Sequence, residues 1–153
     1  MKLALYQPDI PQNLGTNLRT AACFGATVEI IEPCGFAFDD RKIKRAGMDY
    51  IEHVTYTRHN CWKDFVNWAS SNNHRIILLS GRATTAYTDF SYKMGDILLL
   101  GRETSGVPHE VSDYCGDNAV TIPMQEGLRS LNVAVAGAIV LSEAVRQLGR
   151  MQL

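Results

Sequence analysis

Short apolar runs alternate with longer amphipathic segments along most of this chain of 153 residues. Most of the runs are rich in leucine, isoleucine and valine at successive positions, a pattern typical of strands that are buried on both faces of a sheet. Strands are therefore predicted at residues 3–6, 27–31, 53–57, 76–79, 97–100 and 119–122.

Segments long enough for helices lie between these strands and at the end of the chain. Asp39, Asp40 and Asn60 are good N-cap residues, and Gly25 stands where a left-handed C-cap would end the first helix. The predicted helices are residues 13–24, 40–51, 61–71 and 131–148. This alternation predicts an α/β fold with a mostly parallel sheet, helices on both faces, and a ligand at the carboxyl ends of the strands.

Composition narrows the class of protein. Residues 1–153 contain no internal repeat or linker, so a single domain is expected. The formal net charge of -1 argues against an indiscriminate polyanion binder, so a nucleic acid would have to meet a local basic patch. The cysteines form no C-x-x-C pair and the histidines no ligand-spaced cluster, so no metal is expected. With neither a signal-peptide core nor a membrane span, the chain is expected to be cytoplasmic.

Two glycines follow the fifth predicted strand, in Gly101-Arg-Glu-Thr-Ser-Gly106. Glycine permits a sharp turn, or a close approach of backbone to a ligand, at the carboxyl end of a strand. The spacing fits neither the dinucleotide-binding fingerprint nor the phosphate-binding loop, because Val107-Pro108 stands where that loop requires Lys-Ser/Thr. An ordinary turn and a ligand-binding turn both remain compatible with these residues.

A polar pair, Ser130-x-Asn132, opens an almost wholly apolar helix. Ser130 is a good N-cap for that helix, and Asn132 in the first turn could do the same local job. The alternative is an adenosine pocket, because Met124, Gly127 and Leu128 surround the polar groups with apolar surface and flexible backbone.

Two further polar segments have both a structural and a functional interpretation. Asn13-x-Gly15-x-Asn17-x-Arg19, after the first strand, is either a capped helix with Asn17 and Arg19 facing solvent or a functional motif. The basic side chains Arg41, Lys42 and Arg45 share one side of a predicted helix, which is either a solvated face or a contact for an RNA backbone.

The motifs that begin at Asn13, Gly101 and Ile122 together resemble the motif set of the SPOUT superfamily of RNA methyltransferases, in order and in spacing. The resemblance covers nearly the whole chain and is closest to the small tRNA (cytidine/uridine-34) 2'-O-methyltransferases of the TrmL/YibK type. It implies a SPOUT fold with a C-terminal trefoil knot. It also implies that a homodimer transfers a methyl group from S-adenosylmethionine to the wobble nucleotide in the tRNA anticodon stem-loop, leaving S-adenosylhomocysteine.

The same resemblance implies roles for individual residues. The catalytic residues would be Arg19, Ser130 and Asn132, and Glu103 would brace its loop or the dimer contact. The cofactor-binding residues would be Leu79, Gly101, Ile122, Ser130 and Leu131. The RNA-binding residues would be Asn13, Arg41, Lys42 and Arg45.

The chemistry limits what Arg19 can do. A guanidinium stays protonated in proteins, so it is a poor base for a ribose hydroxyl. A clamp on the adjacent RNA phosphate and stabilisation of the forming alkoxide are more plausible, with the proton leaving to phosphate or water.

The chain also departs from the common family pattern. Arg102 and Ser105 replace Pro and Arg, and Ser142 replaces a tyrosine, which puts RNA contacts by these positions in doubt.

Two other functions are compatible with the same fold. One is that of a ribosomal-RNA 2'-O-methyltransferase, which commonly carries an additional RNA-binding domain. The other is that of a non-catalytic RNA- or nucleotide-binding module.

Overall fold

The computed structural model describes residues 1–38, 54–128 and 130–149. In these residues the strands form one parallel sheet in the order β3-β2-β1-β5-β4-β6. The strands are β1 (Lys2–Tyr6), β2 (Thr27–Ile31), β3 (Tyr56–His59), β4 (Ile76–Leu79), β5 (Ile97–Leu100) and β6 (Ala119–Val120).

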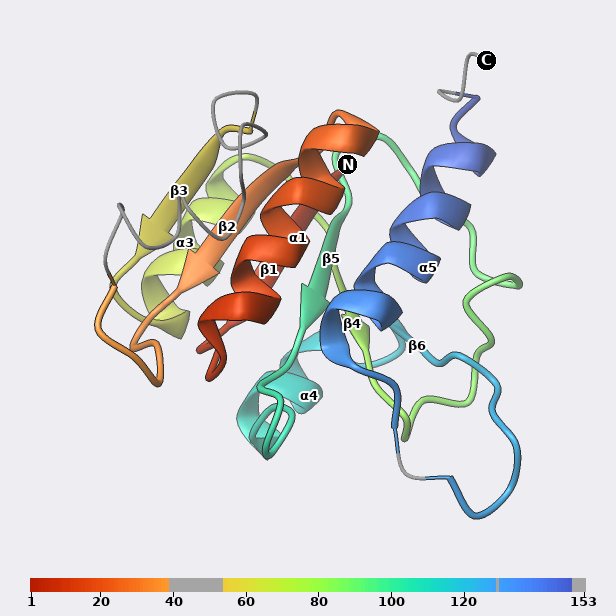
Figure 1. Ribbon diagram of the computed structural model, residues 1–153. Helices are drawn as coiled ribbons and strands as arrows, with labels where there is room; N and C mark the ends of the chain where they lie inside the picture. Colours follow the sequence, from red (N-terminus) through yellow and green to blue (C-terminus); the bar gives the residue numbers. More distant parts are fainter. Residues whose placement is uncertain (39–53, 129, 150–153) are drawn as a thin grey trace.

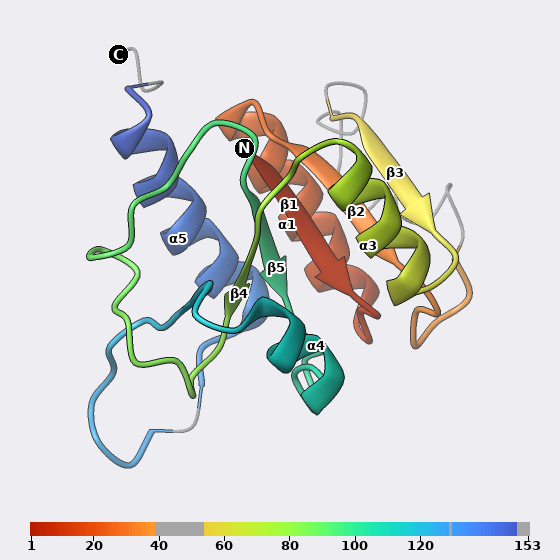
Figure 2. The same ribbon diagram turned by 180° about the vertical axis from the view of Figure 1, so that it is seen from behind.

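Helices cover both faces of the sheet. They are α1 (Pro11–Phe24), α3 (Trp62–Ser71), α4 (His109–Cys115) and α5 (Val133–Gln147). Figure 1 shows α1 and α5 side by side on one face, and Figure 2 shows α3 and α4 on the other. The predicted α/β fold is confirmed, and the C-terminal trefoil knot stays a prediction. The predicted helix at 40–51 lies outside the described residues.

Alternate residues of each central strand enter different cores. In β1, Leu3 and Leu5 pack beneath α1 and α5, whereas Ala4 and Tyr6 pack beneath α3 and α4. Strand β5 is divided in the same way and is fully buried. Burial of each such leucine stabilises the fold by about 1.5–3 kcal/mol. Each continuous apolar run thus contributes side chains to both buried faces of one sheet.

Several local predictions need correction. Gly25 does end α1 in the left-handed region, at φ 63, as predicted. Strand β3, however, begins three residues after the predicted position. Cys61 rather than Asn60 is the N-cap residue of α3, and its side chain makes no capping hydrogen bond. Helix α4 was not predicted, because its 7 residues are too few for a clear helical period.

Candidate active site

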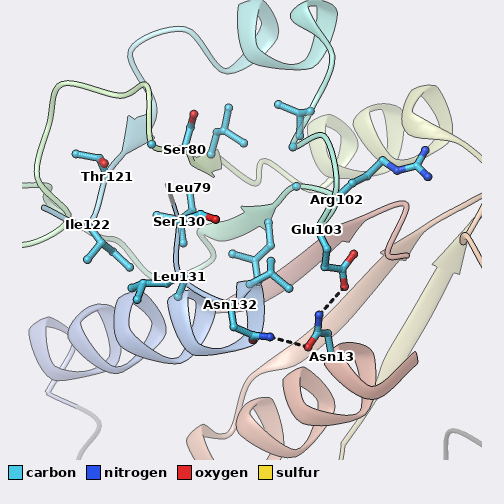
Figure 3. Close-up of a pocket in the computed structure, with 18 of the residues that line it drawn as sticks. Asn13, Leu79, Ser80, Arg102, Glu103, Thr121, Ile122, Ser130, Leu131 and Asn132 are labelled. Atoms are coloured by element: carbon cyan, nitrogen blue, oxygen red, sulfur yellow. Dashed lines mark hydrogen bonds between the residues drawn. The ribbon is translucent and has the colours of Figure 1, made fainter. Parts of the chain in front are cut away.

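A cavity of about 500 Å³ opens at the carboxyl ends of β4, β5 and β6, beside the first turns of α1 and α5 (Figure 3). This volume lies within the usual range for small-molecule sites. The cavity brings together the predicted site residues Asn13, Leu79, Gly101, Ile122, Ser130, Leu131 and Asn132. Residues from the three motifs therefore share one site.

Arg19 is the predicted site residue in the described part of the chain that does not line this cavity. Arg19 is exposed on α1. Since a helix turns by about 100° per residue, Arg19 points away from the side of α1 that carries Asn13. Arg41, Lys42 and Arg45 lie outside the described residues.

One wall of the cavity contains a narrow backbone turn. The N–H of Arg102 donates to the carbonyl of Gly106 at 2.8 Å, and the N–H of Gly106 donates back at 3.0 Å. A Cβ atom on Gly101 would lie 2.7 Å from the carbonyl carbon of Gly106, closer than real Cβ contacts allow. Gly101 is therefore required by the close approach of two backbone segments beside the cavity.

Asp9 joins the loop after β1 to the loop after β5. Its backbone N–H donates to Oε2 of Glu103 at 2.7 Å, and its carboxylate accepts from Oγ1 of Thr104 at 2.7 Å. Arg102 forms an ion pair with the same carboxylate. Hydrogen bonds from Arg102, and secondarily from Thr104, hold the pKa of Asp9 below its usual range. Figure 3 shows the Arg102 side chain extending away from the cavity residues.

A row of hydrogen bonds links the other sides of the cavity. Nδ2 of Asn13 donates to Oε1 of Glu103 at 3.1 Å, and Nδ2 of Asn132 donates to Oδ1 of Asn13 at 3.0 Å (Figure 3). Oδ1 of Asn132 accepts from the backbone N–H groups of Ala134 and Val135, at 2.9 and 3.3 Å. Asn132 is therefore the N-cap residue of α5.

The expected capping role of Ser130 is wrong, because the helix begins two residues further along. Ser130 is exposed and lines the cavity instead. Serine and asparagine are similarly favoured as N-cap residues, so residue type alone could not show which of the two caps α5. The position at which the helix begins decides it.

Asn17 lies between α1 and α5. A simple capped helix would have placed this side chain in solvent. The Asn17 side chain is 1% exposed, and its Nδ2 donates to the carbonyl of Asn13 at 3.0 Å. Its Oδ1 has no hydrogen-bond partner in the described part of the chain. A Cβ atom on Gly137 would lie 3.1 Å from that oxygen and 2.7 Å from Cδ1 of Leu100. Glycine thus allows the two helices to pack closely beside the cavity.

The lining is suited to a ligand with a flat apolar ring and polar substituents. Leu79, Ile122 and Leu131 provide apolar surface, and Ser80 and Thr121 add hydroxyl groups. Ser80 and Thr121 belong to none of the three motifs. Their positions directly after β4 and β6 were the available signal, because ligands of α/β sheets bind beyond the carboxyl ends of strands.

Two negative findings apply to the described residues. They contain no group of His, Cys, Asp or Glu side chains arranged to hold a metal ion. None of the helices at 11–24, 62–71, 109–115 and 133–147 is long and apolar enough to cross a membrane.

Comparisons with known proteins agree with this geometry. The model of the SpoU rRNA Methylase family matches residues 1–142. Over 149 residues the chain is 52% identical to a tRNA (cytidine(34)-2'-O)-methyltransferase of Beijerinckia indica subsp. indica. The match covers 97% of this chain and 92% of that relative.

Solved structures show the same fold. One, described as giving structural insights into the 2-OH methylation of C/U34 on tRNA, matches with a TM-score of 0.90 and 39% identity, and covers 97% of this chain and 95% of that chain. An AdoMet-bound rRNA methyltransferase from Sinorhizobium meliloti matches with a TM-score of 0.85 and 29% identity. That match covers 96% of this chain and 56% of the longer rRNA enzyme.

Proposed function

This chain belongs to the SpoU rRNA Methylase family, and we propose that it is the tRNA methyltransferase that acts on the 2'-hydroxyl of nucleotide 34. The observation that carries the proposal is the near full-length similarity to relatives of that name, together with a cavity formed by all three motifs. The donor of the methyl group is S-adenosylmethionine.

The residues present fit this cofactor. Leu79, Ile122 and Leu131 offer apolar surface for the adenine, and the Gly101 turn leaves backbone groups at the cavity wall. Ser130, which also lines the cavity, would meet the polar end of the ligand. When bound, S-adenosylmethionine supplies an electrophilic methyl group. The protein is left to orient the ribose and to stabilise charge on its oxygen.

Arg19 is proposed as the group that stabilises this oxygen. Its guanidinium would bind the adjacent RNA phosphate and favour the forming alkoxide, while the proton leaves to phosphate or water. The exposed position of Arg19, outside the cavity of its own chain, supports a site completed by a second copy of the chain. The active unit is accordingly a homodimer in which α1 of one protomer faces the cavity of its partner.

The anticodon stem-loop would meet the basic side chains of the predicted helix at 40–51. Arg41, Lys42 and Arg45 are the proposed phosphate contacts. An RNA contact by Asn13 has less support, because this side chain is 9% exposed and both ends of its amide are hydrogen-bonded within the chain.

Mass spectrometry tests the activity directly. The purified protein is incubated with S-adenosylmethionine and tRNA from a strain that lacks the modification, and nucleosides are then located after nuclease digestion. We expect one new 2'-O-methyl group, at position 34. Methylation elsewhere in tRNA, or of ribosomal RNA alone, would contradict the proposed substrate, and a lack of cofactor binding would contradict the enzyme class.

Mixed dimers test whether the site is shared. We expect an Arg19→Ala chain and an Asn132→Ala chain to be nearly inactive alone. A 1:1 mixture should recover about a quarter of wild-type activity, because half of a random set of two-fold dimers has one intact composite site. The measurement is tRNA methylation after unfolding and refolding the chains together. A mixture no more active than its components would place Arg19 and the cavity in one chain.

A further inference from the structure

The hydrogen bonds between Glu103, Asn13 and Asn132 all run in one direction. The first-turn N–H groups of α5 donate to Asn132, Asn132 donates to Asn13, and Asn13 donates to Glu103. These side chains come from three segments far apart in the sequence, and Figure 3 shows them meeting at one side of the cavity. We call this row the amide relay.

Both ends of the amide relay have a fixed polarity. A carboxylate can only accept hydrogen bonds, and a backbone N–H can only donate them. The two asparagine amides between these ends could each be turned over. Of the possible arrangements, only one provides a donor opposite every acceptor, with Nδ2 of each asparagine on the side of Glu103. The ends of the relay therefore determine how both amides are oriented.

Glu103 has no spare oxygen in this arrangement. One carboxylate oxygen accepts from Asn13 at 3.1 Å, and the other accepts from the backbone N–H of Asp9 at 2.7 Å. A glutamine at this position would present one acceptor and one donor. Its NH₂ group would then face either the Asp9 N–H, which opens the loop, or Asn13, whose amide would have to turn over. That reversal would pass to Asn132 and place an NH₂ group against the N–H groups of α5.

We propose that Glu103 is a positioning residue whose carboxylate orients Asn13 and Asn132 and thereby holds the start of α5 against the cavity. The proposal rests on the proposed function, because its effect is exerted on the cofactor site. It assigns Asn132 a role through α5 rather than a contact with RNA. Leu131 and Ser130 directly precede this cap and line the cavity, so a displaced cap displaces them too.

Because the amide relay has fixed ends, two harmful substitutions should compensate each other. Glu103→Gln alone leaves a donor facing a donor. Asn13→Asp alone sets two carboxylates against each other at the position of a 3.1 Å hydrogen bond. In the double variant the introduced glutamine accepts from Asp9 and donates to the introduced aspartate, which also accepts from Asn132. Every hydrogen bond is restored, and a negative charge near the start of α1 suits the helix dipole.

The test measures the affinity of the four proteins for S-adenosylhomocysteine by calorimetry, together with their thermal unfolding midpoints. Each single variant should bind about tenfold more weakly than the wild type, since a helix cap is lost or reversed. The double variant should come within about threefold of the wild type. Glu110→Gln, which removes an exposed carboxylate on α4, is the matched control and should bind normally.

Each outcome decides the proposal. Rescue by the double variant, in affinity or in unfolding midpoint, supports the relay, even if the single variants fail to fold. Losses that simply add in the double variant, or normal binding by Glu103→Gln, overturn it. If the wild type itself does not bind S-adenosylhomocysteine, the proposed function fails, and the unfolding midpoints of the same four proteins still decide whether the relay exists.

Discussion

Replacing Arg19 with alanine should reduce the rate of tRNA methylation by about a hundredfold or more, as the loss of an oxyanion-stabilising donor does. The affinity for S-adenosylmethionine should be nearly unchanged, because the proposed contacts of Arg19 are with the RNA phosphate and the ribose oxygen rather than with the cofactor. Stability should also change little, since Arg19 is exposed. A large effect on turnover with little effect on cofactor binding would identify a group that acts mainly in the transition state.

Single-turnover methylation at saturating tRNA, with cofactor affinity measured by calorimetry, separates these effects. Lys63→Ala is a suitable control, because it removes an exposed positive charge from α3 on the opposite face of the sheet. It should retain normal turnover. Near-normal single-turnover methylation by Arg19→Ala would show that Arg19 is only part of an exposed helix face.

The second large effect is expected at the turn after β5. Gly101→Ala should weaken cofactor binding by at least about tenfold and reduce the free energy of unfolding by roughly 1–3 kcal/mol, the usual range for overpacking. The added Cβ would meet backbone atoms of Gly106 at 2.7 and 2.8 Å, and backbone cannot turn aside as the end of a side chain can. The paired hydrogen bonds between Arg102 and Gly106 would have to lengthen, and Glu103 would move with them.

Calorimetric titration with S-adenosylhomocysteine and thermal unfolding measure both parts of this prediction. Gly81→Ala is the control for stability, because a Cβ there would meet no atom within 4 Å and its φ is not positive. Its unfolding midpoint should stay close to that of the wild type. Gly101→Ala with an unchanged midpoint and unchanged affinity would mean that the turn has room to widen.

Most of the sheet could be predicted from sequence because burial on both faces leaves a simple signal. The runs at β4 and β5 are apolar at every position and were located with the correct bounds. Strand β3 was displaced because Arg58 and His59 are polar. His59 is nevertheless buried, since its Nε2 lies 2.9 Å from a carboxylate oxygen of Glu29 in the neighbouring strand. Such a pairing exists only after the sheet has formed, so local sequence does not reveal it.

For the site, sequence resemblance grouped residues that line one cavity, but it did not predict the hydrogen bonds between them. Leu79, Gly101 and Ile122, which the resemblance assigned to one site, do line the same cavity, and their contact with the cofactor stays a prediction. If residues 13–24 were simply a capped helix, the polar Asn17 would be expected in solvent. It is buried instead, because α5 packs against it, and the local sequence does not reveal that contact. The direction of the amide relay depends on which atoms face each other, and residue types alone do not contain that information.

The position of β1 within the sheet has a consequence for synthesis of the protein. Its neighbour β5 belongs to the other half of the chain, and Asp9 and Glu103, which lie just beyond these two strands, are 94 positions apart. At typical translation speeds the ribosome needs about 5 to 20 s to make the intervening residues. During that interval β1 can pair with β2 while its other edge stays open, exposed to pairing with another nascent chain. Chaperone protection of this edge until β5 is made should therefore matter more for yield than protection of any later strand.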